Sequence, residues 1–257
     1  MDFAVIIPAR YDSTRFPGKP LVDLGGKPMV VHVAERALKS GAREVLVATD
    51  NRAIAEAVRD HGHTAVMTRR SHVSGTDRLA EAVAKQRYPA ARIVVNVQGD
   101  EPLIEPALIR RVAQQLATRR AAQIATACTP IRNIADFINP NVVKVVLDKD
   151  GYALYFSRAS IPYPRDAAMR PDGMLNTLPR GTPAHRHIGI YAYRCGVLQR
   201  FAKLRPAGIE RIEALEQLRA LAHGFRIAVH VTTRAPHPGI DTPDDLARTR
   251  ALLNKNR

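Results

Sequence analysis

The chain has 257 residues, of which 46% are hydrophobic and 25% are charged, and this balance excludes global disorder. Lys and Arg number 39 against 24 Asp and Glu, so the formal net charge is +15. Such a charge predicts attraction to polyanions or to small anionic substrates. No stretch approaches the roughly 18 uncharged apolar residues of a membrane span, and the first residues do not have the pattern of a signal peptide.

Strand and helix patterns alternate through the first half of the chain. Residues 3–7 (FAVII) are an unbroken apolar run, typical of a strand that is buried on both faces. The further strands are expected at 44–48, 64–67, 92–97 and 123–129, and the helices at 28–40, 51–60, 76–87 and 106–118. This alternation predicts an α/β fold with a mainly parallel sheet and helices on both faces.

The pattern changes after residue 130. Two apolar runs, 142–147 and 152–157, flank Asp148-Lys149-Asp150-Gly151, which indicates a β-hairpin. Residues 163–184 are rich in proline and predict a long loop or lid. Further on we expect a strand at 187–194, a helix at 209–222, a strand at 226–232 and a last helix from Thr242. The apolar side of the 209–222 helix is expected to consist of Ile209, Ile212, Leu215, Leu218 and Leu221.

A polar loop, residues 8–20, follows the first strand. It carries Arg10, Arg15 and Lys19 close to Ser13, Thr14 and Gly18. Fixed cations beside free backbone N–H groups suit a triphosphate, although the loop has neither the GxxxxGK[ST] nor the GxGxxG pattern. An exposed basic loop without a ligand is an equally good interpretation of these residues alone.

Two aspartates occupy segments where a metal ligand is expected. Asp100 lies in VQGDEP, at the end of a strand, and Asp241 lies in GIDTPDD. Carboxylates together with substrate phosphates are the ligands that Mg²⁺ prefers. A turn or helix cap is the alternative for each, but Thr242-Pro243 already has the pattern of a cap followed by a first helical residue. We therefore expect Asp100 and Asp241 to converge on a magnesium site that faces the 8–20 loop.

Two further polar groups are candidates for substrate binding. Ser74, Thr76 and Arg78 in SHVSGTDR offer donors for a pyrimidine or a phosphate, although an ordinary helix cap is the simpler interpretation. In the second half, Arg158, His187 and Tyr191 are accompanied by a stripe of polar residues on the 209–222 helix. That stripe consists of Glu210, Glu213, Glu216 and Gln217. These groups suit a polyhydroxylated acid, and a solvated helix face with a structural histidine is the alternative.

Long ordered motifs resemble those of the CMP-Kdo synthetases, the 3-deoxy-manno-octulosonate cytidylyltransferases. They are VIIPARYDSTRFPGKPL, HVSGTDRLAE, VNVQGDEP, NPNVVKVVLDKDGYALYFSRASIPYPRD, HIGIYAYR, EALEQLRAL and GIDTPDDL, and together they span about residues 3 to 250. The related CMP-sialate synthetases share the theme of the opening loop. They are not expected to carry FSRASIP and HIGIYAYR in this form.

The resemblance implies a single nucleotidyltransferase-type domain over residues 1–257, with a smaller lobe in the second half. Residues 1–130 would bind CTP, 131–235 would bind the sugar and form a homodimer, and 236–257 would supply a metal-binding turn and a C-terminal helix. The implied reaction transfers CMP from CTP to the anomeric hydroxyl of 3-deoxy-D-manno-octulosonate (Kdo). It gives CMP-Kdo and pyrophosphate for lipopolysaccharide synthesis, with Mg²⁺ as cofactor.

The resemblance also implies roles for individual residues. Arg10 and Lys19 would hold the CTP phosphates, and Asp100 and Asp241 would bind Mg²⁺. The cytosine would face Ser74, Thr76, Arg78 and Gln98, and the Kdo site would consist of Arg158, His187, Tyr191, Glu216 and Gln217. We expect neither a nucleic acid nor a membrane as a partner, because aromatic residues make up only 5% of the chain and no apolar span is present. Cys128 and Cys195 fit no zinc pattern, which favours reduced thiols in a cytoplasm.

Overall fold

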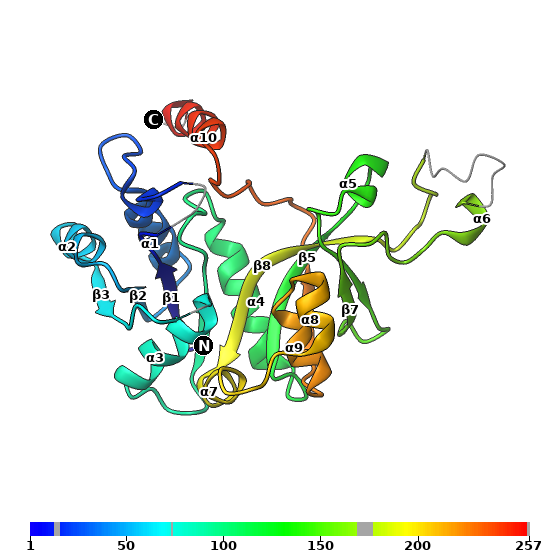
Figure 1. Ribbon diagram of the computed structural model, residues 1–257, viewed down its shortest axis with the longest axis horizontal. Helices are drawn as coiled ribbons and strands as arrows, with labels where there is room; N and C mark the ends of the chain where they lie inside the picture. Colours follow the sequence, from blue (N-terminus) through cyan, green and yellow to red (C-terminus); the bar gives the residue numbers. More distant parts are fainter. Residues whose placement is uncertain (13–15, 73, 169–176, 256–257) are drawn as a thin grey trace.

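The computed structural model describes residues 1–12, 16–72, 74–168 and 177–255 (Figure 1). Its strands are β1 (Phe3–Ala9), β2 (Glu44–Thr49), β3 (Thr64–Met67), β4 (Ile93–Asn96), β5 (Ile124–Pro130), β6 (Lys144–Leu147), β7 (Ala153–Ser157), β8 (His185–Arg194) and β9 (Ile227–Val231). Its helices are η1 (Lys19–Leu21), α1 (Met29–Lys39), α2 (Arg52–Asp60), α3 (Gly75–Lys85), α4 (Pro106–Thr118), α5 (Ile134–Ile138), α6 (Arg165–Ala168), α7 (Cys195–Phe201), α8 (Gly208–Glu213), α9 (Gln217–Ala222) and α10 (Pro243–Lys255).

The strands form one sheet in the order β3-β2-β1-β4-β8-β5-β9, with the β6–β7 hairpin attached to β8. Every strand on this path except β8 runs in the same direction, so the mainly parallel α/β fold is confirmed. Strand β8 comes from the second half of the chain and lies antiparallel between β4 and β5. It therefore places Tyr191 opposite Asn96 of β4, next to the carboxyl ends of the parallel strands.

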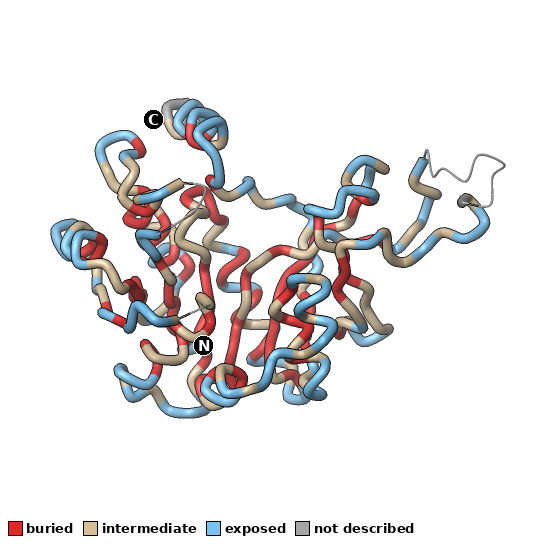
Figure 2. The backbone as a smooth tube through the Cα atoms, in the orientation of Figure 1, coloured by how far each residue is buried: buried red, intermediate tan, exposed pale blue. Residues whose placement is uncertain are grey.

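Helices cover both faces of the sheet, as the alternating pattern predicts. Helices α1, α2 and α4 pack their apolar sides on one face, and α3, α7 and α9 pack on the other (Figure 1). The buried backbone follows the central strands (Figure 2), and the FAVII run of β1 has almost no exposed surface. Burial of each large aliphatic side chain stabilises the sheet by about 1.5–3 kcal/mol, which holds the strand ends in fixed positions.

Part of the second half, from α5 to α6, forms a lobe that projects from this body (Figure 1). The hairpin expected around Asp148-Lys149-Asp150-Gly151 is confirmed as β6 and β7, and the Asp148 carboxylate accepts from the backbone N–H groups of Asp150 and Tyr152. The hairpin, α5 and α6 extend to one side of the sheet (Figure 1). Of the loop expected over 163–184, positions 169–176 lie outside the described residues. No helix in the described ranges is both long and apolar enough to span a membrane.

The prediction of a single helix over residues 209–222 is wrong. The segment forms two short helices, α8 and α9, separated by residues 214–216, and the first of these, Ala214, has a left-handed φ of 50°. The break is held by tertiary contacts, because the Glu213 carboxylate accepts from the Ser157 hydroxyl and from the backbone N–H of Arg158. Ile209 and Ile212 are consequently exposed, whereas Leu215 and Leu218 are buried. The other expected elements end within two residues of their predicted bounds.

Candidate active site

The loop after β1 is closed by a hydrogen bond that brings Lys19 back toward the sheet. The backbone N–H of Gly18 donates to the carbonyl of Tyr11 at 3.0 Å. Gly18 has a φ of 68°, a left-handed conformation that glycine adopts without strain, and it begins the 3₁₀ turn of η1. The buried Pro20 anchors that turn. Three candidates in this loop, Ser13, Thr14 and Arg15, lie outside the described residues.

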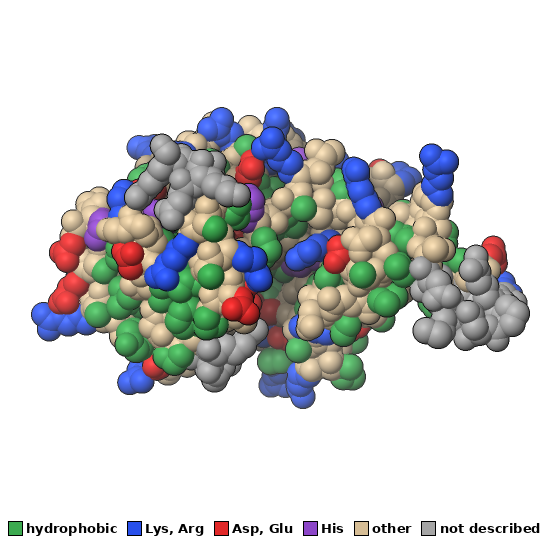
Figure 3. Space-filling model, turned by 90° about the horizontal axis from the view of Figure 1, so that it is seen from above, with side chains coloured by type: hydrophobic (Ala, Val, Ile, Leu, Met, Phe, Trp, Pro, Cys, Tyr) green, Lys and Arg blue, Asp and Glu red, His purple; other side chains and the backbone are tan. Residues whose placement is uncertain are grey.

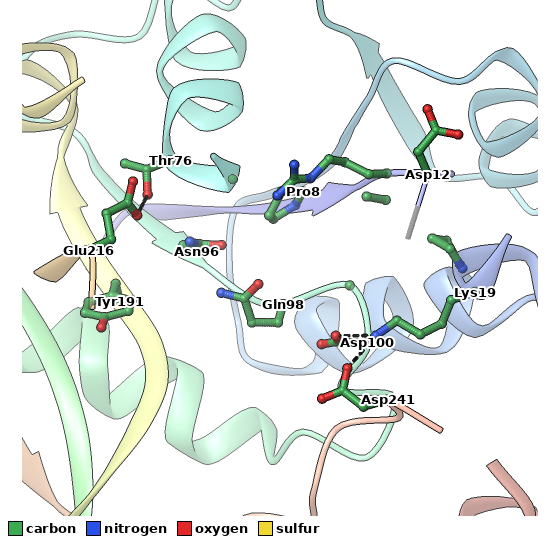
Figure 4. A pocket seen from close by; sticks show the side chains of 15 residues that line it. Pro8, Asp12, Lys19, Thr76, Asn96, Gln98, Asp100, Tyr191, Glu216 and Asp241 are labelled. Carbon is green, nitrogen blue, oxygen red and sulfur yellow. Dashed lines mark hydrogen bonds and ion pairs between the residues drawn. The ribbon is translucent and has the colours of Figure 1, made fainter. Parts of the chain in front are cut away.

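Lys19 bridges the two aspartates (Figure 4). Its Nζ lies 2.7 Å from Asp100 Oδ2 and 3.1 Å from Asp241 Oδ1. The Lys19 side chain is only 12% exposed, whereas those of Asp100 and Asp241 are 32% and 50% exposed. The structure therefore brings these three residues together, as expected, and leaves carboxylate surface open to solvent.

The positions of the two carboxylates are set by the backbone. A Cβ atom at Gly99 would lie 2.9 Å from the carbonyl oxygen of Pro8, so only glycine permits this approach of β1 to the segment after β4. The backbone N–H of Ile240 donates to the carbonyl of Asp100 at 2.9 Å and thereby fixes Asp241 beside Asp100. Ile240 is itself fully buried against Leu24 and its neighbours.

Thr242, and not Asp241, caps helix α10. The Thr242 hydroxyl accepts from the backbone N–H of Asp245 at 3.2 Å, and the Asp245 carboxylate accepts from the Thr242 hydroxyl at 2.8 Å. The hydrogen bond from Thr242 is the main reason that the pKa of Asp245 falls to about 2. This arrangement agrees with the expectation that Asp241 has a separate role.

A cavity of about 500 Å³ opens beside this cluster, at the carboxyl ends of β1 and β4 (Figure 4). This is the edge at which open α/β sheets bind ligands, and the volume suits a small organic substrate. The predicted site residues that border it are Arg10, Lys19, Thr76, Gln98, Asp100, Tyr191, Glu216 and Asp241. Their roles in binding and catalysis stay predictions.

The first turn of α3 departs from the expectation that Ser74, Thr76 and Arg78 all face the cavity. Ser74 forms a capping box with Asp77, so its hydroxyl accepts from the Asp77 N–H. The Thr76 hydroxyl borders the cavity and donates to Glu216 Oε2 at 2.6 Å. Arg78 is fully buried, and its guanidinium donates to Asp50 and Thr68. Arg78 therefore contributes no atom to the cavity wall.

The acidic residues expected along one stripe have three different partners. Glu210 forms an ion pair with Arg219, Glu213 binds the backbone and side chain at the end of β7, and Glu216 accepts from Thr76. The break at Ala214 turns them apart. Arg158 also lies away from the cavity, because its guanidinium donates to the carbonyls of Glu213 and Pro140. Gln217 borders a smaller adjacent cavity of about 110 Å³, which shares Tyr191 and Glu216 with the main cavity.

His187 lies behind Tyr191 and does not border the main cavity. The centroids of the two rings are 5.4 Å apart. Burial lowers the pKa of His187 from 6.5 to about 3 and raises that of Tyr191 well above its ordinary value. The Thr126 hydroxyl donates its proton to the carbonyl of Ile190 at 2.7 Å. Because the same hydroxyl oxygen lies 3.0 Å from His187 Nε2, it accepts a hydrogen bond there, and the neutral His187 carries its proton on Nε2.

The sequence analysis did not identify Asn96 and Asp12, which also border the cavity. Asn96 ends the apolar run of β4, and a polar residue at that position was a usable signal. Asp12 is paired with Arg70 at 2.9 Å.

Comparison with known proteins identifies the family of the chain. Residues 4–227 match the family model of the cytidylyltransferases, and the chain belongs to the cytidylyltransferase family. It is therefore a nucleotidyltransferase. Among solved structures, CMP:2-keto-3-deoxy-manno-octonic acid synthetase complexed with CTP is 43% identical, with a TM-score of 0.88 over 99% of this chain and 100% of that chain. This similarity confirms the resemblance to the CMP-Kdo synthetases.

A second solved structure shares the fold alone. It is a nucleotidyl transferase from Methanothermobacter, 17% identical, with a TM-score of 0.61 and coverage of 99% of each chain.

His187 generates a prediction about pH. The folded state keeps it neutral down to about pH 3, whereas the unfolded chain takes up a proton below about pH 6.5. The contribution of His187 to the free energy of unfolding is therefore fully present above about pH 6.5, and it is lost as the pH falls toward 3. We expect His187→Gln to reduce the loss of unfolding free energy between about pH 7.5 and pH 5 by about 1–2 kcal/mol. Urea denaturation at both values measures this difference. His237→Gln, at an exposed position, should follow the wild type, and an equally steep decline in His187→Gln would contradict the prediction.

Proposed function

We propose that this protein transfers CMP from CTP to the anomeric hydroxyl of Kdo, giving CMP-Kdo and pyrophosphate for lipopolysaccharide synthesis. The observation that carries the proposal is the cluster of Lys19, Asp100 and Asp241 at the edge of a cavity on the ligand-binding side of the sheet. The 43% identity to a CMP:2-keto-3-deoxy-manno-octonic acid synthetase that binds CTP supports the choice of both substrates.

Asp100 and Asp241 fit a magnesium site. The single ammonium of Lys19 offsets only one of their two carboxylate charges, so the cluster retains a negative charge that attracts a cation. Burial raises the pKa of the neighbouring Glu101 to about 8, with the charge of Asp100 as a second cause, so Glu101 is largely neutral at pH 7. Within the described ranges no group of three or more acidic, His or Cys side chains could hold a metal. Mg²⁺ needs only one or two carboxylates when phosphates supply its other ligands.

The reaction asks the chain mainly for alignment and neutralisation of charge. CTP brings about four negative charges and Kdo adds a carboxylate, so the two substrates repel each other strongly. Arg10 and Lys19 would neutralise phosphate oxygens at the open end of the cavity, and Asp100 and Asp241 would hold the metal. Bound Mg²⁺ supplies further charge neutralisation and a lowered pKa for the attacking hydroxyl. The hydroxyl attacks the α-phosphorus in line, and pyrophosphate leaves.

We further propose that the parts of the chain divide these tasks. Residues 1–130 carry the 8–20 loop and the strand ends that border the cavity. Residues 131–235 carry Tyr191 and Glu216 on the side proposed for the sugar, and residues 236–257 carry Asp241 and helix α10. Cys128 and Cys195 are both buried free thiols, which agrees with action in the cytoplasm.

The net charge of +15 favours a nucleic-acid-binding protein as the competing class. Lys and Arg side chains are scattered over the face seen in Figure 3 and do not form one stripe, so the charge fits an anionic substrate better. Nucleic-acid binding predicts an affinity that falls steeply with salt, and filter binding against salt concentration measures it.

An acceptor assay tests the proposed function. Pyrophosphate release is measured with protein, Mg²⁺ and CTP, and with either Kdo or sialate as acceptor. We expect rapid release with Kdo and little with sialate, and CTP alone is the control. A preference for sialate, or no release with any sugar acid, would overturn the proposal.

Removal of one metal-binding carboxylate tests the roles of the aspartates. Asp100→Asn and Asp241→Asn are isosteric, so the fold should be retained, whereas kcat should fall on the order of 10²-fold or more because charge neutralisation is lost. The control is Asp244→Asn in the exposed first turn of α10. Turnover of either variant near that of the wild type at saturating Mg²⁺ would refute the metal assignment.

We also propose that the protein is a homodimer formed by its second half. Several large apolar side chains are exposed there, including Ile212 at 87% and Leu154 at 62%, and the α5–β7 region projects into solvent. Leu154→Glu combined with Ile212→Glu should halve the mass measured by light scattering. Leu38→Glu, an exposed apolar residue of the first half, should leave the mass unchanged. A monomeric wild type would remove the basis of this proposal.

A further inference from the structure

Asn96 presents an unpaired polar atom inside the cavity wall. It is only 4% exposed, it ends β4 after three buried apolar residues, and it borders the main cavity. Its Oδ1 is buried and accepts no hydrogen bond from the described residues. Buried side-chain acceptors nearly always have a partner, so this one calls for a donor that the described residues do not supply.

A second acceptor without a hydrogen bond belongs to a residue that borders the same cavity. Glu216 accepts from Thr76 through Oε2, while its Oε1 is buried without a hydrogen-bond donor among the described residues. The nearest cation, Arg219 Nη2, lies 4.0 Å from Oε1, which is an ion-pair distance and too long for a hydrogen bond. Tyr191 lies opposite Asn96 in the β4–β8 ladder, so it borders the same part of the cavity. In Figure 4 these side chains lie at one end of the cavity, and Lys19, Asp100 and Asp241 lie at the other.

The chemistry of this end excludes the triphosphate as its occupant. Phosphate oxygens donate no hydrogen bonds, and the carboxylate of Glu216 repels them. A polyhydroxylated acid offers several hydroxyl donors at the spacing of neighbouring carbons. The cytosine amino group is the competing donor, and the test separates it from the sugar.

We propose that Asn96 determines acceptor specificity, its Oδ1 accepting from one hydroxyl of the sugar acid while Glu216 Oε1 accepts from another. This inference rests on the proposed function and adds Asn96 to the sugar-binding residues. A site built to pair with a hydroxyl discriminates strongly against an analogue that lacks it, because the buried acceptor is then left unpaired.

The test combines Asn96→Ala with a panel of Kdo analogues that each lack one hydroxyl. We expect the substitution to lower kcat/KM for Kdo by about 10- to 100-fold and to leave the Kd for CTP, measured by calorimetry, within about twofold. For one analogue, the wild type should lose on the order of 10²-fold relative to Kdo, whereas the variant should lose less than about threefold. Asn96→Ser, which keeps a polar oxygen, should retain part of the discrimination.

Val94→Ala is the matched control. Val94 is fully buried and lies two residues before Asn96, on the same face of β4, and it does not border the cavity. It should destabilise the fold without changing the ranking of the analogues. A weaker Kd for CTP in Asn96→Ala, or discrimination equal to that of the wild type across the panel, would overturn the inference. If the wild type rejects Kdo but uses another sugar acid, the proposed function fails, and the Asn96 comparison is made with deoxy analogues of that acceptor.

Discussion

One ammonium group joins three parts of the chain that are far apart in sequence. Lys19 is 81 positions from Asp100 and 222 from Asp241, and it contacts both carboxylates. Without this cation the two carboxylates would repel each other by about 1 kcal/mol in water and by more in a partly buried cleft. The arrangement also explains why the cluster suits phosphates and a metal. A phosphate would take the place of the carboxylates beside Lys19, and a metal ion would take the place of Lys19 beside the carboxylates.

The geometry of that cluster depends on the backbone more than on the charges. The hydrogen bond from Ile240 to the carbonyl of Asp100 brings Asp241 to its place, and the burial of Ile240 with Leu24 and Met29 attaches α10 to the region around η1. The absence of a Cβ at Gly99 allows β1 and the segment after β4 to approach closely. Apolar packing and close backbone contact thus hold charged groups where their mutual repulsion alone would separate them.

The strand ends and their aspartates were predictable, whereas long-range pairings were not. Apolar runs mark the strands, and the carboxyl ends of parallel strands meet at one edge, so Asp100 could be placed near the 8–20 loop from its sequence position. The burial of Arg78 against Asp50 has no local signature, since its two partners belong to other elements. The break at Ala214 was equally hidden, because contacts of Glu213 with β7 override an apolar pattern that favours one continuous helix.

The antiparallel insertion of β8 explains why the cavity has two chemically different ends. Had β5 followed β4 directly in the sheet, Tyr191 of β8 would not lie opposite Asn96 at the cavity. Strand β8 instead places Tyr191 against β4, and the hydrogen bond from Thr76 attaches Glu216 to the first turn of α3. The groups proposed to accept from sugar hydroxyls, Asn96 and Glu216, therefore border the same cavity as Arg10 and Lys19, which are proposed to hold phosphates. A transferase that joins a sugar to a nucleotide requires this juxtaposition, and here the order of the strands provides it.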